Sequence, residues 1–108
     1  MSIVVPRRRN QASHDRCVQR LAQGLSLEGW SIEAHVGGWP KPPYINDFIP
    51  DIRARKGEDT RIIEVETEDT LSVDIAQHHA FQRYAAGSLG TTFLLYLARE
   101  DGTCRLIR

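Results

Sequence analysis

The 108-residue sequence predicts an α/β fold, in which a mixed central sheet is flanked by helices. Two segments show the apolar period of amphipathic helices, one beginning after Ser13 and one covering residues 71–87. Short strand-like segments lie between and after them, and two of these are joined by a tight polar turn. The second helix has to cross over to bring the chain back beside this hairpin, which makes the sheet mixed.

The first half of the chain is expected to contain one helix and one strand. The Ser13 hydroxyl can cap the helix, which ends near Gly29. Residues 30–36 alternate apolar and polar, as is typical of a half-buried strand, and residues 37–47 are irregular. The apolar stripe of the helix consists of His14, Cys17, Val18, Leu21, Ala22 and Leu25.

The second half is expected to begin with a β-hairpin whose strands are residues 48–55 and 60–67. The apolar run at residues 91–98 is typical of a strand that is covered on both faces. A last short strand is expected at residues 103–107. The stripe of the helix at residues 71–87 consists of Val73, Ala76, Gln77, Ala80, Phe81 and Tyr84.

Composition indicates one domain, with a basic tail at residues 1–12 and a folded part at residues 13–108. The chain is 41% hydrophobic and 26% charged, and it has neither an apolar run of membrane-spanning length nor a secretory signal. A cytoplasmic protein is therefore expected. Cys17 and Cys104 are too few and too far apart in sequence for a disulfide framework or a zinc site, so both are expected to be buried small hydrophobes.

Three acids lie within the predicted hairpin. If its turn is symmetric about residues 57 and 58, Asp51 lies opposite Glu64, and strand alternation puts Glu66 on the same face. Facing residues have Cβ atoms about 4.5–5.5 Å apart, where like charges are destabilising. A divalent cation held by hard oxygen ligands would compensate. Each acid alone also fits a solvated strand position, but the three together favour a metal site.

The second helix carries three polar residues that bear on this site. Gln77 interrupts the apolar stripe, and a buried amide needs partners, so it is expected above the acidic cluster. His78 and His79 point about 100° apart and cannot both reach one ion. Both histidines are therefore expected on the helix surface.

Pro50-Asp51, the segment Ile63-Glu64-Val65-Glu66 and the element order resemble the PD-(D/E)XK nuclease superfamily over roughly residues 13–98. The resemblance implies the αβββαβ restriction-endonuclease-like core shared with Holliday-junction-resolvase-like members, plus a short C-terminal strand. It implies that Asp51 and Glu64 bind Mg²⁺ (or Mn²⁺). Glu66 stands where the family usually has a lysine, and some restriction-type members carry Glu there.

The resemblance implies a divalent-metal-dependent nuclease that acts on DNA, and a chain of this size is expected to work as a homodimer or with a partner subunit. Glu66 would be the base or a ligand of a second metal, and Gln77 would orient a water or touch phosphate. The alternative is a catalytically inactive module of the same fold that binds nucleic acid or a protein partner.

Basic residues are the candidates for DNA contacts, although the formal net charge is zero. The triple arginine at residues 7–9 is either a nucleic-acid contact or a solvated terminus. The segment at residues 39–44 is either a recognition loop, with Lys41 and aromatics near DNA, or a stiff connector. The expected backbone contacts are Arg7, Arg8, Arg9, Lys41, Arg53 and Arg55.

Overall fold

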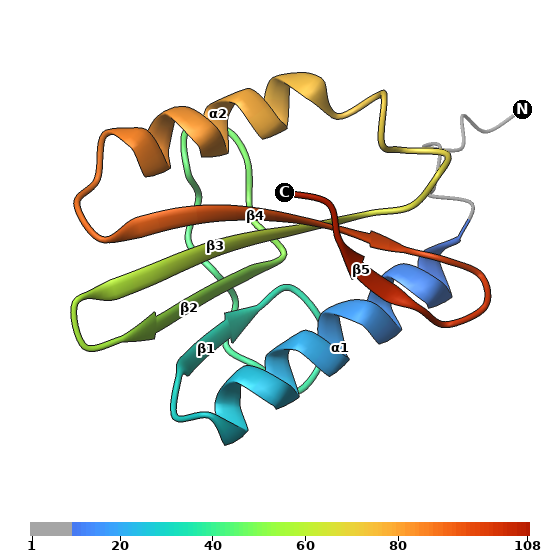
Figure 1. Cartoon of the computed structure of the whole chain (residues 1–108), viewed down its shortest axis with the longest axis horizontal. Helices are drawn as coiled ribbons and strands as arrows, with labels where there is room; N and C mark the ends of the chain where they lie inside the picture. The colour runs from blue at the N-terminus through green and yellow to red at the C-terminus, as the bar shows by residue number, and fades with distance from the viewer. Residues whose placement is uncertain (1–9) are drawn as a thin grey trace, which may run out of the picture.

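In the computed structural model, which describes residues 10–108, a five-stranded sheet has one helix on each face (Figure 1). The strand order is β1-β2-β3-β4-β5, with β3 and β4 parallel and the other pairs antiparallel. The predicted α/β class with a mixed sheet and a crossover helix is therefore confirmed. The elements are α1 (Gln11–Leu27), β1 (Ser31–Ala34), β2 (Ile52–Lys56), β3 (Asp59–Glu66), α2 (Ile75–Ala86), β4 (Thr91–Ala98) and β5 (Cys104–Leu106).

The hairpin of β2 and β3 has the predicted register. Ile52 pairs with Ile63, and Lys56 pairs with Asp59 next to the turn. Gly57 has φ +59°, a left-handed conformation that glycine adopts without strain. The symmetric turn thus sets which residues face each other along both strands.

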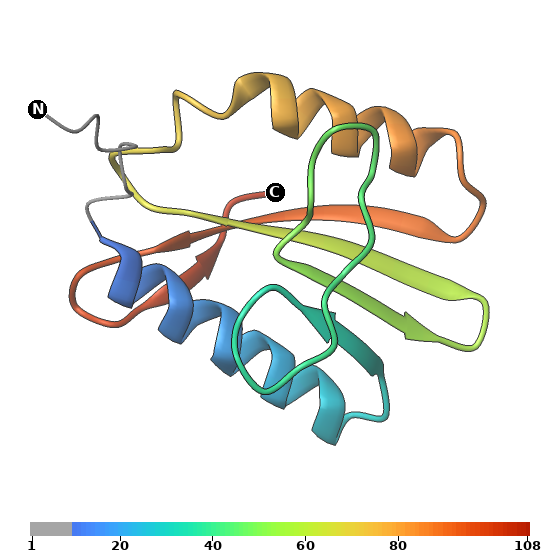
Figure 2. The same ribbon diagram turned by 180° about the vertical axis from the view of Figure 1, so that it is seen from behind.

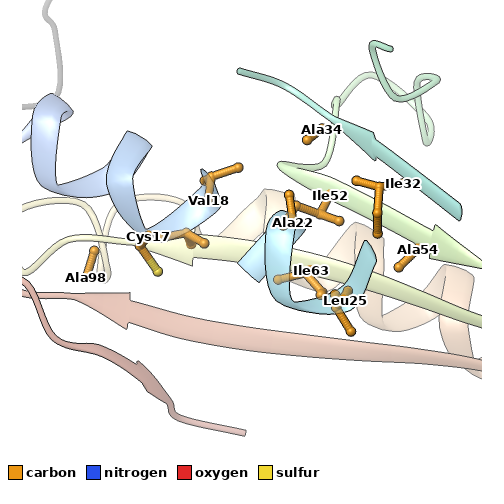
Figure 3. Close-up of a cluster of buried hydrophobic side chains, with 11 residues drawn as sticks. Cys17, Val18, Ala22, Leu25, Ile32, Ala34, Ile52, Ala54, Ile63 and Ala98 are labelled. Atoms are coloured by element: carbon orange, nitrogen blue, oxygen red, sulfur yellow. The ribbon is translucent and has the colours of Figure 1, made fainter. Parts of the chain in front are cut away.

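Alternation along β3 divides the core into two clusters. Ile63 and Val65 belong to the cluster on the α1 side of the sheet. Figure 3 shows Ile63 there with Val18 and Ala22 of α1 and with residues of β1 and β2. Ile62 faces α2 and packs with Phe81. Glu64 and Glu66 share the parity of Ile62, so they lie on the α2 side of the sheet.

Several element boundaries differ from the predicted ones. Helix α1 begins at Gln11, so Ser13 is inside its first turn rather than at its cap, and the helix starts within the residues expected to be tail. Strand β2 begins at Ile52 rather than at residue 48. Phe48 instead forms an isolated bridge with Ile45, and the loop that carries both crosses the sheet to α2 (Figure 2).

The buried face of α2 is also different. The helix begins at Ile75, so Val73 lies before it and is 72% exposed, and Ala76 and Tyr84 are exposed as well. The buried residues are His78, Ala80 and Phe81. The placement of His78 on the helix surface is wrong, because it is 3% exposed, whereas His79 is exposed as expected.

The two cysteines form a disulfide bond, with their Cα atoms 5.5 Å apart. The expectation of two separate buried hydrophobes is therefore wrong. Cys104 pairs with Ala98 on β4, on the α1 side of the sheet, where Cys17 of α1 meets it. Neither helix of residues 10–108 has the length and apolar character to cross a bilayer.

Candidate functional site

The three acids gather where β2 begins and β3 ends. Asp51 directly precedes β2, and Glu64 and Glu66 lie in the last half of β3. The hairpin register brings Asp51 beside Glu64, and the Asp51 backbone N–H donates to Glu64 Oε1 at 3.1 Å. Asp51 is 7% exposed, Glu64 1% and Glu66 0%, so Asp51 is the acid most open to solvent.

Asp51 is held in its ionised form by its neighbours. Its Oδ2 accepts the Val65 N–H at 2.8 Å, and its Oδ1 lies 3.2 Å from His14 Nε2. Burial alone would raise the pKa of Asp51. The hydrogen bond and charge of His14, with the bonds to Glu64 and Val65, outweigh burial and bring the pKa below its ordinary value.

Glu64 behaves in the opposite way. Burial, followed by the charges of Asp51 and Glu66, raises the pKa of Glu64 well above its ordinary value. Its Oε2 accepts a hydrogen bond from Gln77 Nε2, so the amide lies over the acidic cluster as the sequence predicted. The lowered pKa of Asp51 and the raised pKa of Glu64 both favour protonation of Glu64 before Asp51.

Glu66 is the deepest of the acids. The Nε2 atom of His78 lies 3.9 Å from Glu66 Oε2, and both side chains are enclosed between α2 and the sheet. Burial lowers the pKa of His78, which favours a neutral imidazole. The second helix thus presents a neutral amide and a neutral ring to the acids.

Two histidines at this site were not among the predicted site residues. His14 was predicted only as part of the apolar stripe of the first helix, and it reaches Asp51 from the first turns of α1. A titratable residue on an otherwise apolar stripe could have indicated that His14 has a polar partner in the core. His78 was missed because the apolar residues of the second helix predicted a different face as the buried one.

The predicted DNA-contacting residues do not form one cluster. Arg53 is half-buried, with its Nε 2.6 Å from Glu33 Oε1, and the exposed Arg55 has its Nη2 3.8 Å from the same oxygen. Lys41 lies on the loop over Tyr44, with Nζ 6.0 Å from the ring centroid. The arginines at residues 7–9 lie outside the described residues.

The acids offer the oxygen donors that a hard cation prefers, but they are too few to surround the ion without other ligands. Carboxylate oxygens are the ligands that Mg²⁺ prefers, and Mg²⁺ is commonly held by one or two carboxylates with waters and substrate phosphate. Within residues 10–108, no group of three or more His, Cys, Asp or Glu side chains is arranged to hold an ion. Asp51 and Glu64 are the acids in direct contact there, and they are the residues that could hold such an ion.

No protein-family model, curated protein or solved structure matches this chain.

Proposed function

We propose that this chain is a divalent-metal-dependent nuclease-like domain that hydrolyses phosphodiester bonds of DNA. The observation that carries the proposal is the contact between Asp51 and Glu64, two buried carboxylate residues that the hairpin register brings together. The order of α1, β1, β2, β3, α2 and β4, with β3 and β4 parallel, supports the finer assignment to a restriction-endonuclease-like core.

Asp51 and Glu64 would hold Mg²⁺ or Mn²⁺, which lowers the pKa of a bound water and neutralises charge on the phosphate. Asp51 is already ionised, and Glu64 releases its proton as the cation binds, because a positive charge favours the ionised carboxyl. Gln77 holds the Glu64 carboxyl in orientation through its amide. Glu66 accepts the proton of the attacking water or helps to hold a second ion.

The substrate backbone would be bound by arginines on the strands beside the acids. Arg53 follows Asp51 by two residues, on the same side of the strand, and Arg55 continues that row. Glu33 is the only acid paired with them among the described residues, so the pair keeps a net positive charge. Arg7, Arg8, Arg9 and Lys41 are the further candidates, in a cytoplasmic protein that works as a homodimer or with a partner subunit.

The second candidate function is a catalytically inactive module of the same fold that binds nucleic acid or a protein partner. Two observations favour it. Glu66 occupies the position of the family's usual lysine, and the described residues contain no complete three-ligand group for a metal.

Cleavage of DNA separates the two functions. Supercoiled, linear and branched DNA are incubated with Mn²⁺ and the wild type, Asp51→Asn or Glu64→Gln. The nuclease predicts nicking or cutting by the wild type and a loss of about 100-fold or more in both variants, because each removes a metal ligand. Asp59→Asn and Glu58→Gln are the matched controls, since they make the same changes at exposed positions of the same hairpin. Equal cleavage by all five proteins, or none by any, rejects the nuclease.

A further inference from the structure

The disulfide joins the helix that carries His14 to the last strand of the sheet. Cys17 follows His14 by three residues, about one turn, so both side chains lie on the same face of α1. Both are buried, at 3% and 4% exposure. Cys104 is the first residue of β5, and 87 positions separate it from Cys17. One covalent bond therefore ties the first turns of α1 to β5, which is remote from them in sequence.

Among residues 10–108, the first turns of α1 reach the rest of the fold through His14 and Cys17, while the side-chain hydrogen bonds of Gln11 and Arg16 stay within the helix. Its N-cap, Asn10, makes no side-chain cap, and no acidic residue in the first turn complements the helix dipole. The remaining buried residues of the helix, Val18, Ala22 and Leu25, all lie after Cys17. Arg20 Nη1 donates to Gly102 O at 2.9 Å, which ties the middle of the helix to the turn before β5. Before Val18, the buried contacts are those of His14 and Cys17.

We propose that the Cys17–Cys104 disulfide is a redox switch that holds the first turns of α1, and with them His14, against Asp51. Its effect on metal binding rests on the proposed function. His14 Nε2 lies 3.2 Å from Asp51 Oδ1 when the bond is intact. Without the bond, the helix before Val18 opens more often, and Asp51 loses the partner that orients it.

The reductant is a dithiol, and Cys104 is the point of attack, because it is half-buried whereas Cys17 is enclosed. One thiolate of the dithiol attacks Cys104 Sγ, the disulfide bond breaks, and Cys17 leaves as a thiolate that takes up a proton. The second thiol of the reductant then attacks the mixed disulfide. Cys104 leaves and is protonated, and the reductant becomes a disulfide after supplying two electrons.

Amide hydrogen exchange of the full chain tests the switch without metal or DNA. Oxidised and dithiol-reduced wild type are compared with Cys104→Ser, which breaks the bond but keeps the buried Cys17. The switch predicts that amides of residues 11–17 exchange at least about tenfold faster in the reduced protein and in Cys104→Ser, through an opening that costs less free energy than global unfolding of the same protein. The reductant should have no effect on Cys104→Ser. Equal exchange of residues 11–17 in both redox states overturns the switch, and so does exchange of these residues in the reduced protein only through global unfolding.

A Mn²⁺ titration of both redox states tests the link to the site. About tenfold weaker binding by the reduced protein is expected, as for the loss of a group that orients a ligand. Equal binding by the two states overturns the link between the bond and Asp51. If neither state binds Mn²⁺, the proposed function fails, and the exchange measurement alone decides whether the bond controls α1.

Discussion

Asp51 and Glu64 are neighbours with opposite pKa shifts, although both are buried acids. The difference comes from their partners. Asp51 has His14 and the Val65 N–H, which favour its charge, whereas Glu64 faces two other acids. Two carboxyls this close share one proton, and the environment assigns it to Glu64. A cation would replace that proton, which makes metal binding and proton release two aspects of the same event.

Glu64→Gln is expected to become more stable than the wild type as the pH rises. The folded state raises the pKa of Glu64 above its ordinary value of 4.5, so the native protein binds more protons than the unfolded chain above that pH. The contribution of Glu64 to the free energy of unfolding is fully present below pH 4.5. It decreases as the pH rises above that value, by up to about 1.4 kcal/mol per pH unit. Glutamine has the shape of the neutral glutamic acid and does not titrate, so Glu64→Gln does not lose this stability as the pH rises.

Urea denaturation without divalent cations, at several pH values from about 5 to 7, measures this difference. Glu58→Gln, an exposed position in the turn of the same hairpin, should track the wild type. A constant difference between Glu64→Gln and wild type across this range contradicts the raised pKa.

At the level of elements, the most deeply buried side chain that α2 packs on the sheet is an aromatic ring. Phe81 is 0% exposed and lies 5.8 Å from Phe93 and 6.4 Å from Phe48 between ring centroids. It joins the helix to β4 and to the loop that crosses the sheet. Gln77 is one turn earlier on this helix. The packing of Phe81 therefore also helps to position the Gln77 amide over Glu64.

Phe81→Ala is expected to lower the free energy of unfolding by about 3–5 kcal/mol, because it removes a fully buried ring and leaves a cavity. Tyr84→Ala, on the same helix at 39% exposure, is the control and should change it by less than about 1 kcal/mol. Urea denaturation of both variants measures the difference. Similar losses in the two variants would show that Phe81 does not anchor α2.

The hairpin could be predicted from sequence because its determinants are local. The turn at residues 56–59 is short and symmetric, so it sets the register of Asp51 and Glu64 without help from the rest of the chain. The start of β2 was not predictable in this way. Residues 48–50 read as strand, but Phe48 packs beneath α2, a contact that depends on the tertiary fold.

The face of α2 was also missed for a physical reason. Val73, Ala76 and Tyr84 served to place the predicted stripe, but all three are exposed. The helix begins at Ile75, so Val73 lies before it, and the face turned to the sheet carries His78, Ala80 and Phe81. The place of Gln77 could be predicted because it belongs to the predicted stripe and also lies next to His78 on the face that is buried.

At the level of the whole molecule, the disulfide could not be predicted because it depends on topology alone. Cys17 and Cys104 meet only after α1 has packed on the sheet and β5 has paired with β4. No local pattern connects residues 87 positions apart. Such a long closed loop restricts the unfolded chain strongly, so the bond contributes to stability as well as to the position of α1.

Reduction of the disulfide is expected to lower the free energy of unfolding by about 4–5 kcal/mol at 25 °C, the chain-entropy estimate for a loop of this length. Denaturant unfolding with and without a dithiol measures the change. In the Cys17→Ser/Cys104→Ser double variant, the dithiol should have no effect. An unchanged wild-type midpoint on complete reduction, verified by thiol titration, contradicts a stabilising bond.

Calorimetric titration with Mn²⁺ and Mg²⁺ tests the central claim, that Asp51 and Glu64 form a divalent-cation site. Such a site predicts saturable binding by the oxidised wild type, with about tenfold or greater loss of affinity in Asp51→Asn and Glu64→Gln. Asp59→Asn and Glu58→Gln should bind as the wild type does. Heats of dilution alone for the wild type, or equal affinity in all five proteins, would contradict the site.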